Sequence, residues 1–194
     1  MKRLLFALSV LLLPGVAFAF DPSPATVRIG ILRAPDTFRY EAAEHVHRAI
    51  RESLSAELRS RGFDAYEVEA NFDQVSRDAD RNADFYVEIA GDSETSDRGG
   101  LGVGGRHASL TMGKLVSTVA ADFFVYDGRT MEMIANDTLT GRDSAFVPTS
   151  VGIGGSNLFA WIAMPFIERA QVRGVARDVA RELAGRVTVA VRSH

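Results

Sequence analysis

Three apolar patterns follow one another near the start of the chain, and they limit the fold more than any other feature. Val27, Ile29 and Ile31 alternate with other residues, which is the period-two pattern of a strand with one buried face. Over residues 40–61 apolar side chains recur every three or four positions, as in an amphipathic helix. Residues 63–69 predict a second strand directly afterwards. A strand, a helix and a strand in this order predict an α/β fold.

The middle of the chain continues with weaker patterns. Residues 71–82 predict a short helix, and the alternation over residues 85–89 predicts a third strand. Residues 91–105 are polar and then glycine-rich. Because neither a two-residue nor a helical apolar period is evident there, we predict a loop.

The second half predicts an antiparallel hairpin and a helix. A long strand over residues 115–125 and a return strand over 130–139 are joined by Asp127-Gly128, a dipeptide typical of tight hairpin turns. Residues 172–183 have helical spacing, and the β-branched run 187–189 predicts a closing strand. The predicted fold class is therefore α/β, a mixed sheet with a long antiparallel hairpin and helices packed mainly on one face.

The N-terminus is typical of a cleaved export signal. A short basic start precedes a ten-residue uncharged apolar run, and small residues then mark a cleavage site at Ala17 and Ala19. Ten residues are too few to span a bilayer, which takes about 20. We predict a signal peptide over residues 1–19 and a single α/β envelope domain over residues 20–194, located in the periplasm.

Composition excludes several kinds of chemistry. The chain has no cysteine, which excludes a thiol nucleophile, a cysteine-ligated metal and lipid attachment at an N-terminal cysteine, so we predict that the protein is not a lipoprotein. Without Lys2 and Arg3, 20 basic residues face 25 acidic ones, a net charge of −5. Since affinity for nucleic acid depends on clustered positive charge, we predict no nucleic-acid partner.

Three motifs that resemble ligand sites fail on their context. Gly100–Gly105 fits G-x-G-x-x-G but lacks the preceding strand and the following helix that hold a pyrophosphate. Residues 78–82 match only the first half of a calcium loop. His45 and His47 stand two apart on a predicted helix and so point in different directions. We therefore predict no cofactor, no metal and no catalytic residue.

Two carboxylates keep an enzymatic alternative open. Glu88 and Asp122 lie on predicted strands among apolar neighbours, where burial would shift their pKa values. A buried carboxylate paired with an arginine is a more common arrangement than a catalytic base.

Residues 144–167 are 24 residues without a charge. Their prolines and glycines exclude a membrane-spanning helix. Two interpretations remain open, an apolar lid packed on the sheet or an exposed patch for a protein partner or a membrane surface. In the second case the candidate partner-binding residues are Phe159, Trp161 and Phe166.

The succession of elements resembles a small bacterial envelope domain. This domain occurs in the curli-secretion lipoprotein, in the penicillin-binding-protein activators and at the N-terminus of the Tol translocation protein. Uncharacterised envelope proteins with two glycine-rich segments are the most similar, at positions matching Gly99–Gly105 and Gly152–Gly155. The resemblance rests on five segments: Val27–Ile31, Arg61–Phe63, Ala83–Val87, Phe124–Thr130 and Ala170–Leu183.

This resemblance implies binding of other envelope proteins rather than catalysis. We expect a non-enzymatic, exported accessory module that docks onto an envelope protein partner. The alternative is an outer-membrane-associated homo-oligomer assembled through the two glycine-rich segments.

Overall fold

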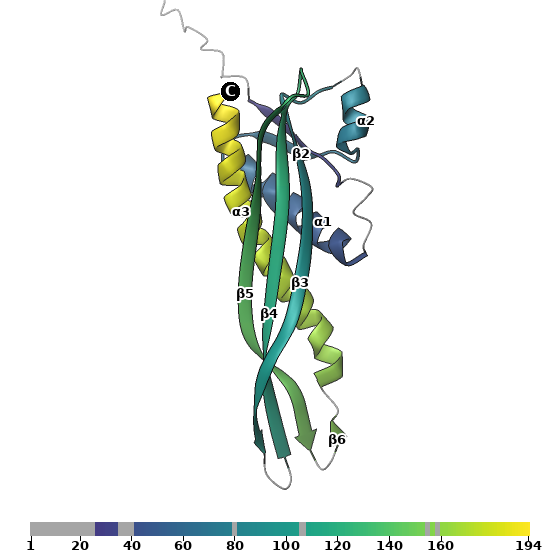
Figure 1. Cartoon of the computed structure of the whole chain (residues 1–194), viewed down its shortest axis with the longest axis vertical. Helices are drawn as coiled ribbons and strands as arrows, with labels where there is room; N and C mark the ends of the chain where they lie inside the picture. The colour runs from purple at the N-terminus through teal and green to yellow at the C-terminus, as the bar shows by residue number, and fades with distance from the viewer. Residues whose placement is uncertain (1–25, 35–40, 79–80, 105–107, 154–155, 158–159) are drawn as a thin grey trace, which may run out of the picture.

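The computed structural model describes residues 26–34, 41–78, 81–104, 108–153, 156–157 and 160–194. One six-stranded mixed sheet has the strand order β2-β1-β3-β4-β5-β6 (Figure 1). The predicted α/β class is confirmed, and the predicted signal peptide and its cleavage site lie outside the described residues. In chain order the elements are β1 (Arg28–Ile31), α1 (Glu41–Ser60), β2 (Asp64–Glu67), α2 (Phe72–Arg77), β3 (Phe85–Gly104), β4 (Ala108–Asp127), β5 (Met133–Ile153), β6 (Ser156–Asn157) and α3 (Ala160–Ser193).

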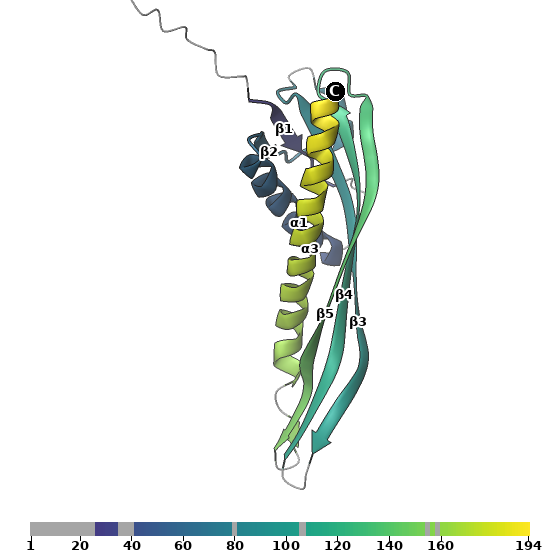
Figure 2. The same cartoon turned by 90° about the vertical axis from the view of Figure 1, so that its left-hand side faces the viewer.

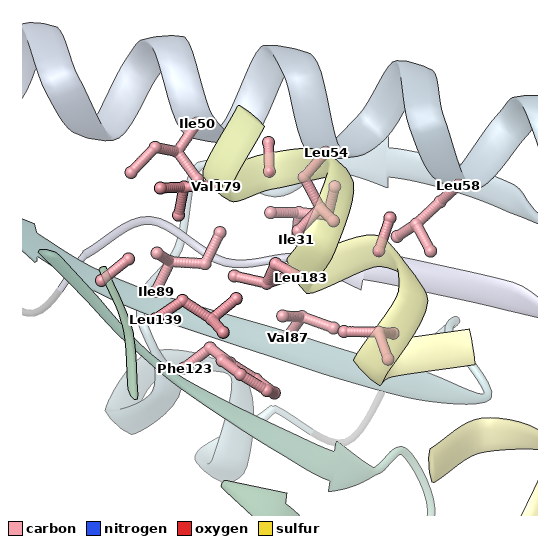
Figure 3. Packing of buried hydrophobic residues seen from close by; sticks show 14 of the residues in the cluster. Ile31, Ile50, Leu54, Leu58, Val87, Ile89, Phe123, Leu139, Val179 and Leu183 are labelled. Atoms are coloured by element: carbon pink, nitrogen blue, oxygen red, sulfur yellow. The ribbon is translucent and has the colours of Figure 1, made fainter. Parts of the chain in front are cut away.

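The first three elements form a parallel unit. β1 pairs in parallel with β2 on one side and with β3 on the other, and α1 makes the crossover between β1 and β2 that parallel pairing requires. The buried stripe of α1 faces the sheet, and Gly62, with φ of 91°, follows its end. Figure 3 shows Ile50, Leu54 and Leu58 from this stripe packed with Ile31 and Val87 of the sheet.

A polar stripe on α1 fixes the helix to the edge of the sheet. Arg51 donates a hydrogen bond of 3.1 Å to the carbonyl of Val68. Ser55 and Arg59 both donate to the carbonyl of Ala65, at 3.5 and 2.6 Å. These side chains are four residues apart and therefore lie on one side of the helix. They supply partners to the carbonyl of Ala65 in β2, an edge strand of the described sheet, and to the carbonyl of Val68 directly after it.

The three antiparallel strands are much longer than predicted. β3 and β4 have 20 residues each and β5 has 21. The loop predicted over residues 91–105 is wrong, because β3 continues to Gly104 and pairs with β4 over its whole length. Ladder hydrogen bonds to a neighbouring strand do not depend on side chains, so a glycine-rich segment can still form a strand.

The turn between β4 and β5 is also wider than predicted. The amide of Asp127 donates to the carbonyl of Glu132, and the amide of Met131 donates to the carbonyl of Asp127. Met131, with φ of 59°, adopts the left-handed conformation. The prediction of a tight two-residue turn at Asp127-Gly128 is therefore wrong.

α3 is a single helix of 34 residues, and the closing strand predicted over residues 187–189 is wrong. Val179, Leu183, Val187 and Val191 are all buried. Their four-residue spacing continues the buried stripe of α3 through the β-branched run, so burial overrides local strand propensity.

α3 packs closely on β5 at Gly141, a residue without a side chain. A Cβ atom at Gly141 would lie 2.6 Å from Cγ2 of Val179 and 2.8 Å from Cγ1 of Val175. Such distances are shorter than van der Waals contact. Glycine at this position allows the helix to approach the sheet.

The two long helices cover one face of the sheet, as predicted (Figure 2). The short helix α2 lies on the opposite face, where Val75 packs with Leu32 and Tyr86 in a smaller cluster. Asn71 caps α2, since its side chain accepts from the amide of Gln74 and the side chain of Gln74 accepts from the amide of Asn71.

Candidate binding surface on the distal arm

The long strands extend past the beginning of α3 (Figures 1 and 2). We call this extension the distal arm and define it as residues 101–104 of β3, 108–114 of β4, 146–153 of β5 and the two residues of β6. The remainder of the domain, with α1, α2 and most of α3, is called the body. The two long helices lie mainly over the body, and the arm extends beyond the beginning of α3.

Strand pairing gathers apolar side chains on one face of the arm. Leu101 of β3 lies opposite Met112 of β4, and Met112 lies opposite Pro148 of β5. Directly opposite residues point to the same face of a sheet, and so do residues two apart on one strand. We call these five residues the arm patch: Leu101, Leu110, Met112, Phe146 and Pro148.

The arm patch lies on the face opposite α1 and α3. Along β4, Leu115 and Val119 point to the helices and are buried in the core. Leu110 and Met112 are separated from Leu115 and Val119 by odd numbers of residues along β4, so their side chains point to the face away from the helices. Leu101 is 75% exposed, Phe146 63% and Leu110 44%, which are large values for apolar side chains on neighbouring strands.

Charge is sparse around the arm patch. Residues 99–113 contain a single charged residue, Arg106, and residues 144–167 contain none. Lys114, opposite Phe146, lies at the border between the arm and the charged body. An exposed apolar patch in an uncharged setting is characteristic of an interaction surface, because its burial releases water without desolvating charges.

The uncharged segment 144–167 is neither a lid nor a single patch. Residues 144–153 belong to β5 and residues 160–167 begin α3, so the lid interpretation is wrong. Within β5, burial differs between neighbouring side chains, since Val147 is buried whereas Phe146 is exposed.

The three predicted partner-binding residues have different outcomes. Phe166, on α3, is 70% exposed. Phe159 lies outside the described residues, and so does the side chain of Trp161, although its backbone is part of α3. Leu101, Leu110 and Met112 were missed because the surrounding glycines suggested a loop. Their signal is the two-residue spacing of Leu110 and Met112.

Glu88 is the buried carboxylate that the sequence suggested. It is 7% exposed on β3, and burial raises its pKa even though the backbone amide of Phe72 and the hydroxyl of Tyr126 donate to it. Burial also raises the pKa of Tyr126 to about 12, and the neighbouring Glu88 adds to this effect. The ring of Tyr126 stacks against Phe72, with centroids 4.2 Å apart. Glu88 therefore holds the beginning of α2 to the sheet.

Asp122 does not fit its prediction. It is exposed, because the alternation of β4 buries its neighbour Phe123 and points Asp122 outward. Its Oδ1 accepts a hydrogen bond of 2.6 Å from the hydroxyl of Thr138 on β5. The predicted burial of this carboxylate is therefore wrong. Thr138 is a cross-strand hydrogen-bond partner and not a second acid or a base.

The two histidines of α1 point apart, as their spacing predicted. His45 is exposed, whereas His47 is buried and its Nε2 accepts from the amide of Gly91 at 3.3 Å. Burial lowers the pKa of His47, and the nearby Arg51 lowers it further. Over the described ranges, no three acidic or histidine side chains converge as a metal site would require.

None of the helices within the described part of the chain has both the length and the apolar character needed to cross a membrane.

No family model and no curated protein matches the chain. Solved structures with a similar course include a minor lipoprotein from Acinetobacter baumannii, with 16% identity, a TM-score of 0.42 and coverage of 84% of this chain and 90% of that one. A lipoprotein from Neisseria meningitidis has 13% identity, a TM-score of 0.39 and coverage of 77% and 98%. The PelC dodecamer from Paraburkholderia phytofirmans has 12% identity, a TM-score of 0.37 and coverage of 80% and 88%. Similarity at this level assigns neither a family nor an activity to this chain.

Proposed function

We propose that this chain is a non-enzymatic, exported accessory module that docks onto an envelope protein through the arm patch. Export to the periplasm rests on the signal-like residues 1–19. Docking rests on one observation, the exposure of Leu101, Leu110 and Phe146 on the face opposite α1 and α3. The partner must present an apolar surface of its own.

Two side chains of the arm patch have the exposure needed to contribute affinity for a partner. Full burial of one large apolar side chain contributes about 1.5–3 kcal/mol before the costs of association. Leu101 and Phe146 begin largely exposed, so both retain most of that gain for a partner. Large apolar side chains at the centre of an interface supply most of its affinity, and we assign these two residues that role.

The test compares two double variants in the full chain. In Leu101→Ser with Phe146→Ser, the arm patch loses its two most exposed side chains. Met133→Ser with Val189→Ser is the matched control, because Met133 (53% exposed) and Val189 (69%) lie on the body. A photoreactive residue at Leu110 captures the partner in periplasmic extracts, and mass spectrometry identifies it.

We expect one dominant envelope protein with the wild type and with the control, and its loss with the arm variant. Equal capture by both double variants would reject docking through the arm patch. Circular dichroism of each variant confirms that the fold is retained, since all four positions are exposed.

The open edges of the sheet support a second candidate, a homo-oligomer associated with the outer membrane. β1 pairs with β3 only at Phe85–Val87, and β6 pairs with β5 only at Gly152 and Ile153. Over the described residues, the remaining parts of β3 and β5 pair on one side only, with β4. Such open edges are templates for pairing with another chain. A monomeric mass at all concentrations, with recovery only in the soluble periplasmic fraction, would exclude this candidate.

A further inference from the structure

A separate cleft of about 500 Å³ opens on the helix side of the sheet, between the first half of α1, the first half of α3 and β3. It is distinct from the arm patch, which faces the other side. Ligand pockets in proteins are typically 300–1,000 Å³. Its lining residues are His45, Val46, Arg48, Ala49, Glu52, Ser93, Thr95, Glu168, Arg169, Val172 and Arg173.

The floor of this cleft is polar where a core would be apolar. On β3 the residues that face the helices are Val87 and Ile89 in the core, both fully or almost fully buried. Further along the same face stand Ser93 and Thr95, which line the cleft. The strand therefore presents hydrogen-bonding groups to whatever occupies the cleft.

Two arginines on the α3 wall form no ion pair with another described residue. Arg169 and Arg173 are exposed and stand one helical turn apart. Among the residues that the structure describes, neither forms an ion pair, whereas Arg48 on the opposite wall pairs with Glu44 at 2.8 Å. Like charges one helical turn apart repel each other. An anion between them would remove that repulsion and gain charge-assisted hydrogen bonds.

We propose that the cleft binds a small hydroxylated organic anion, an acidic or phosphorylated sugar. Arg169 and Arg173 hold its carboxylate or phosphate, because guanidinium groups match both in geometry. Glu52 and Glu168 are acceptors for the sugar hydroxyls, and Ser93 and Thr95 both donate and accept. Few apolar side chains line the cleft, which excludes a lipid tail. This site is independent of the proposed docking function.

Calorimetric titration of the full mature chain tests the site. The probes are D-glucuronate, glucose 6-phosphate and neutral glucose. Arg169→Gln with Arg173→Gln removes the proposed anion contacts, and glutamine retains good helix propensity. Arg142→Gln with Arg177→Gln is the matched control, since it removes two exposed arginines outside the cleft.

We expect one or both anions to bind and glucose to bind at least about tenfold more weakly, because it lacks the charged group. The cleft variant should weaken anion binding by about tenfold or more, and the control should not change it. Stronger binding of glucuronate identifies a sugar acid, and stronger binding of glucose 6-phosphate identifies a sugar phosphate. Absence of binding by both anions, or equal loss in the two variants, would overturn the proposal. Either result leaves the capture of a partner through the photoreactive residue at Leu110 untouched, so the two proposals fail separately.

Discussion

The body and the distal arm are built from the same three strands, yet they bury their side chains differently. In the body, Ile89 and Phe123 lie under α1 and α3 and are almost completely buried. In the arm, Leu101 continues the same strand as Ile89 but faces away from the helices and is largely exposed. The difference shows that helix cover, not strand formation, decides whether an apolar residue of this sheet stabilises the fold or remains available to a partner.

The comparison predicts its largest effect for matched leucines. Leu183→Ala in the body should lower the free energy of unfolding by about 2–5 kcal/mol, because a cavity remains at a fully buried site. Leu101→Ala in the arm should change it by no more than about 0.5 kcal/mol. Urea unfolding followed by circular dichroism measures both. A loss for Leu101→Ala as large as that for Leu183→Ala would show that the arm is part of the core.

A smaller effect is predicted where the body closes on β5. Gly141→Ala should cost about 1–3 kcal/mol, since the new methyl group would overlap Val175 and Val179 of α3. Gly174→Ala is the control on α3 itself, because no atom lies within 4 Å of a Cβ there. We expect the control to stabilise the helix by about 0.5–1 kcal/mol. Equal effects of the same sign would contradict the close packing of α3 on β5.

The smallest effect concerns pH and the α2 side of the body. Because burial raises the pKa of Glu88 above its ordinary value of 4.5, protonation of Glu88 favours the folded state. Its contribution is fully present below pH 4.5 and is lost as pH rises through the folded pKa. Glu88→Gln should therefore gain stability relative to wild type as pH rises above 4.5. Unfolding curves at several pH values measure this difference, and a constant difference would contradict it.

Asp127 should change stability with pH in the opposite direction, which the same unfolding curves would show. Hydrogen bonds from the amides of Thr130 and Arg129 lower its pKa below the ordinary value of 3.8. Its contribution is present above pH 3.8 and disappears as pH falls through the folded pKa. The advantage of wild type over Asp127→Asn should therefore shrink at low pH.

Sequence patterns located the elements whose signals are local. The stripe of α1 from Val46 to Leu58 and the alternation of β1 needed no information from elsewhere in the chain. The mixed sheet and its one-sided helix cover followed from the order of these elements. Glu88 and Asp122 had the same sequence signal, and the tertiary structure buries only Glu88.

Other features depended on distant partners. Gly102 is a strand residue because it lies opposite Thr111 of β4. Val187 is helical because the core of the body continues to the end of α3. Asp122 is exposed because β4 buries the residues on either side of it, Ala121 and Phe123. In each case a neighbouring strand or helix decided against the local propensity.

By itself, the sequence determined the α/β class, the strand-helix-strand order around α1 and the scarcity of charge in what became the arm, since periodicity and charge are local properties. Only the tertiary structure decided that the glycine-rich segment extends β3, that Leu101, Met112 and Pro148 share a face, and that Arg169 and Arg173 line a cleft with Ser93 and Thr95. The physical reason is that strand register and helix packing join residues far apart in the chain, and burial is a property of that arrangement.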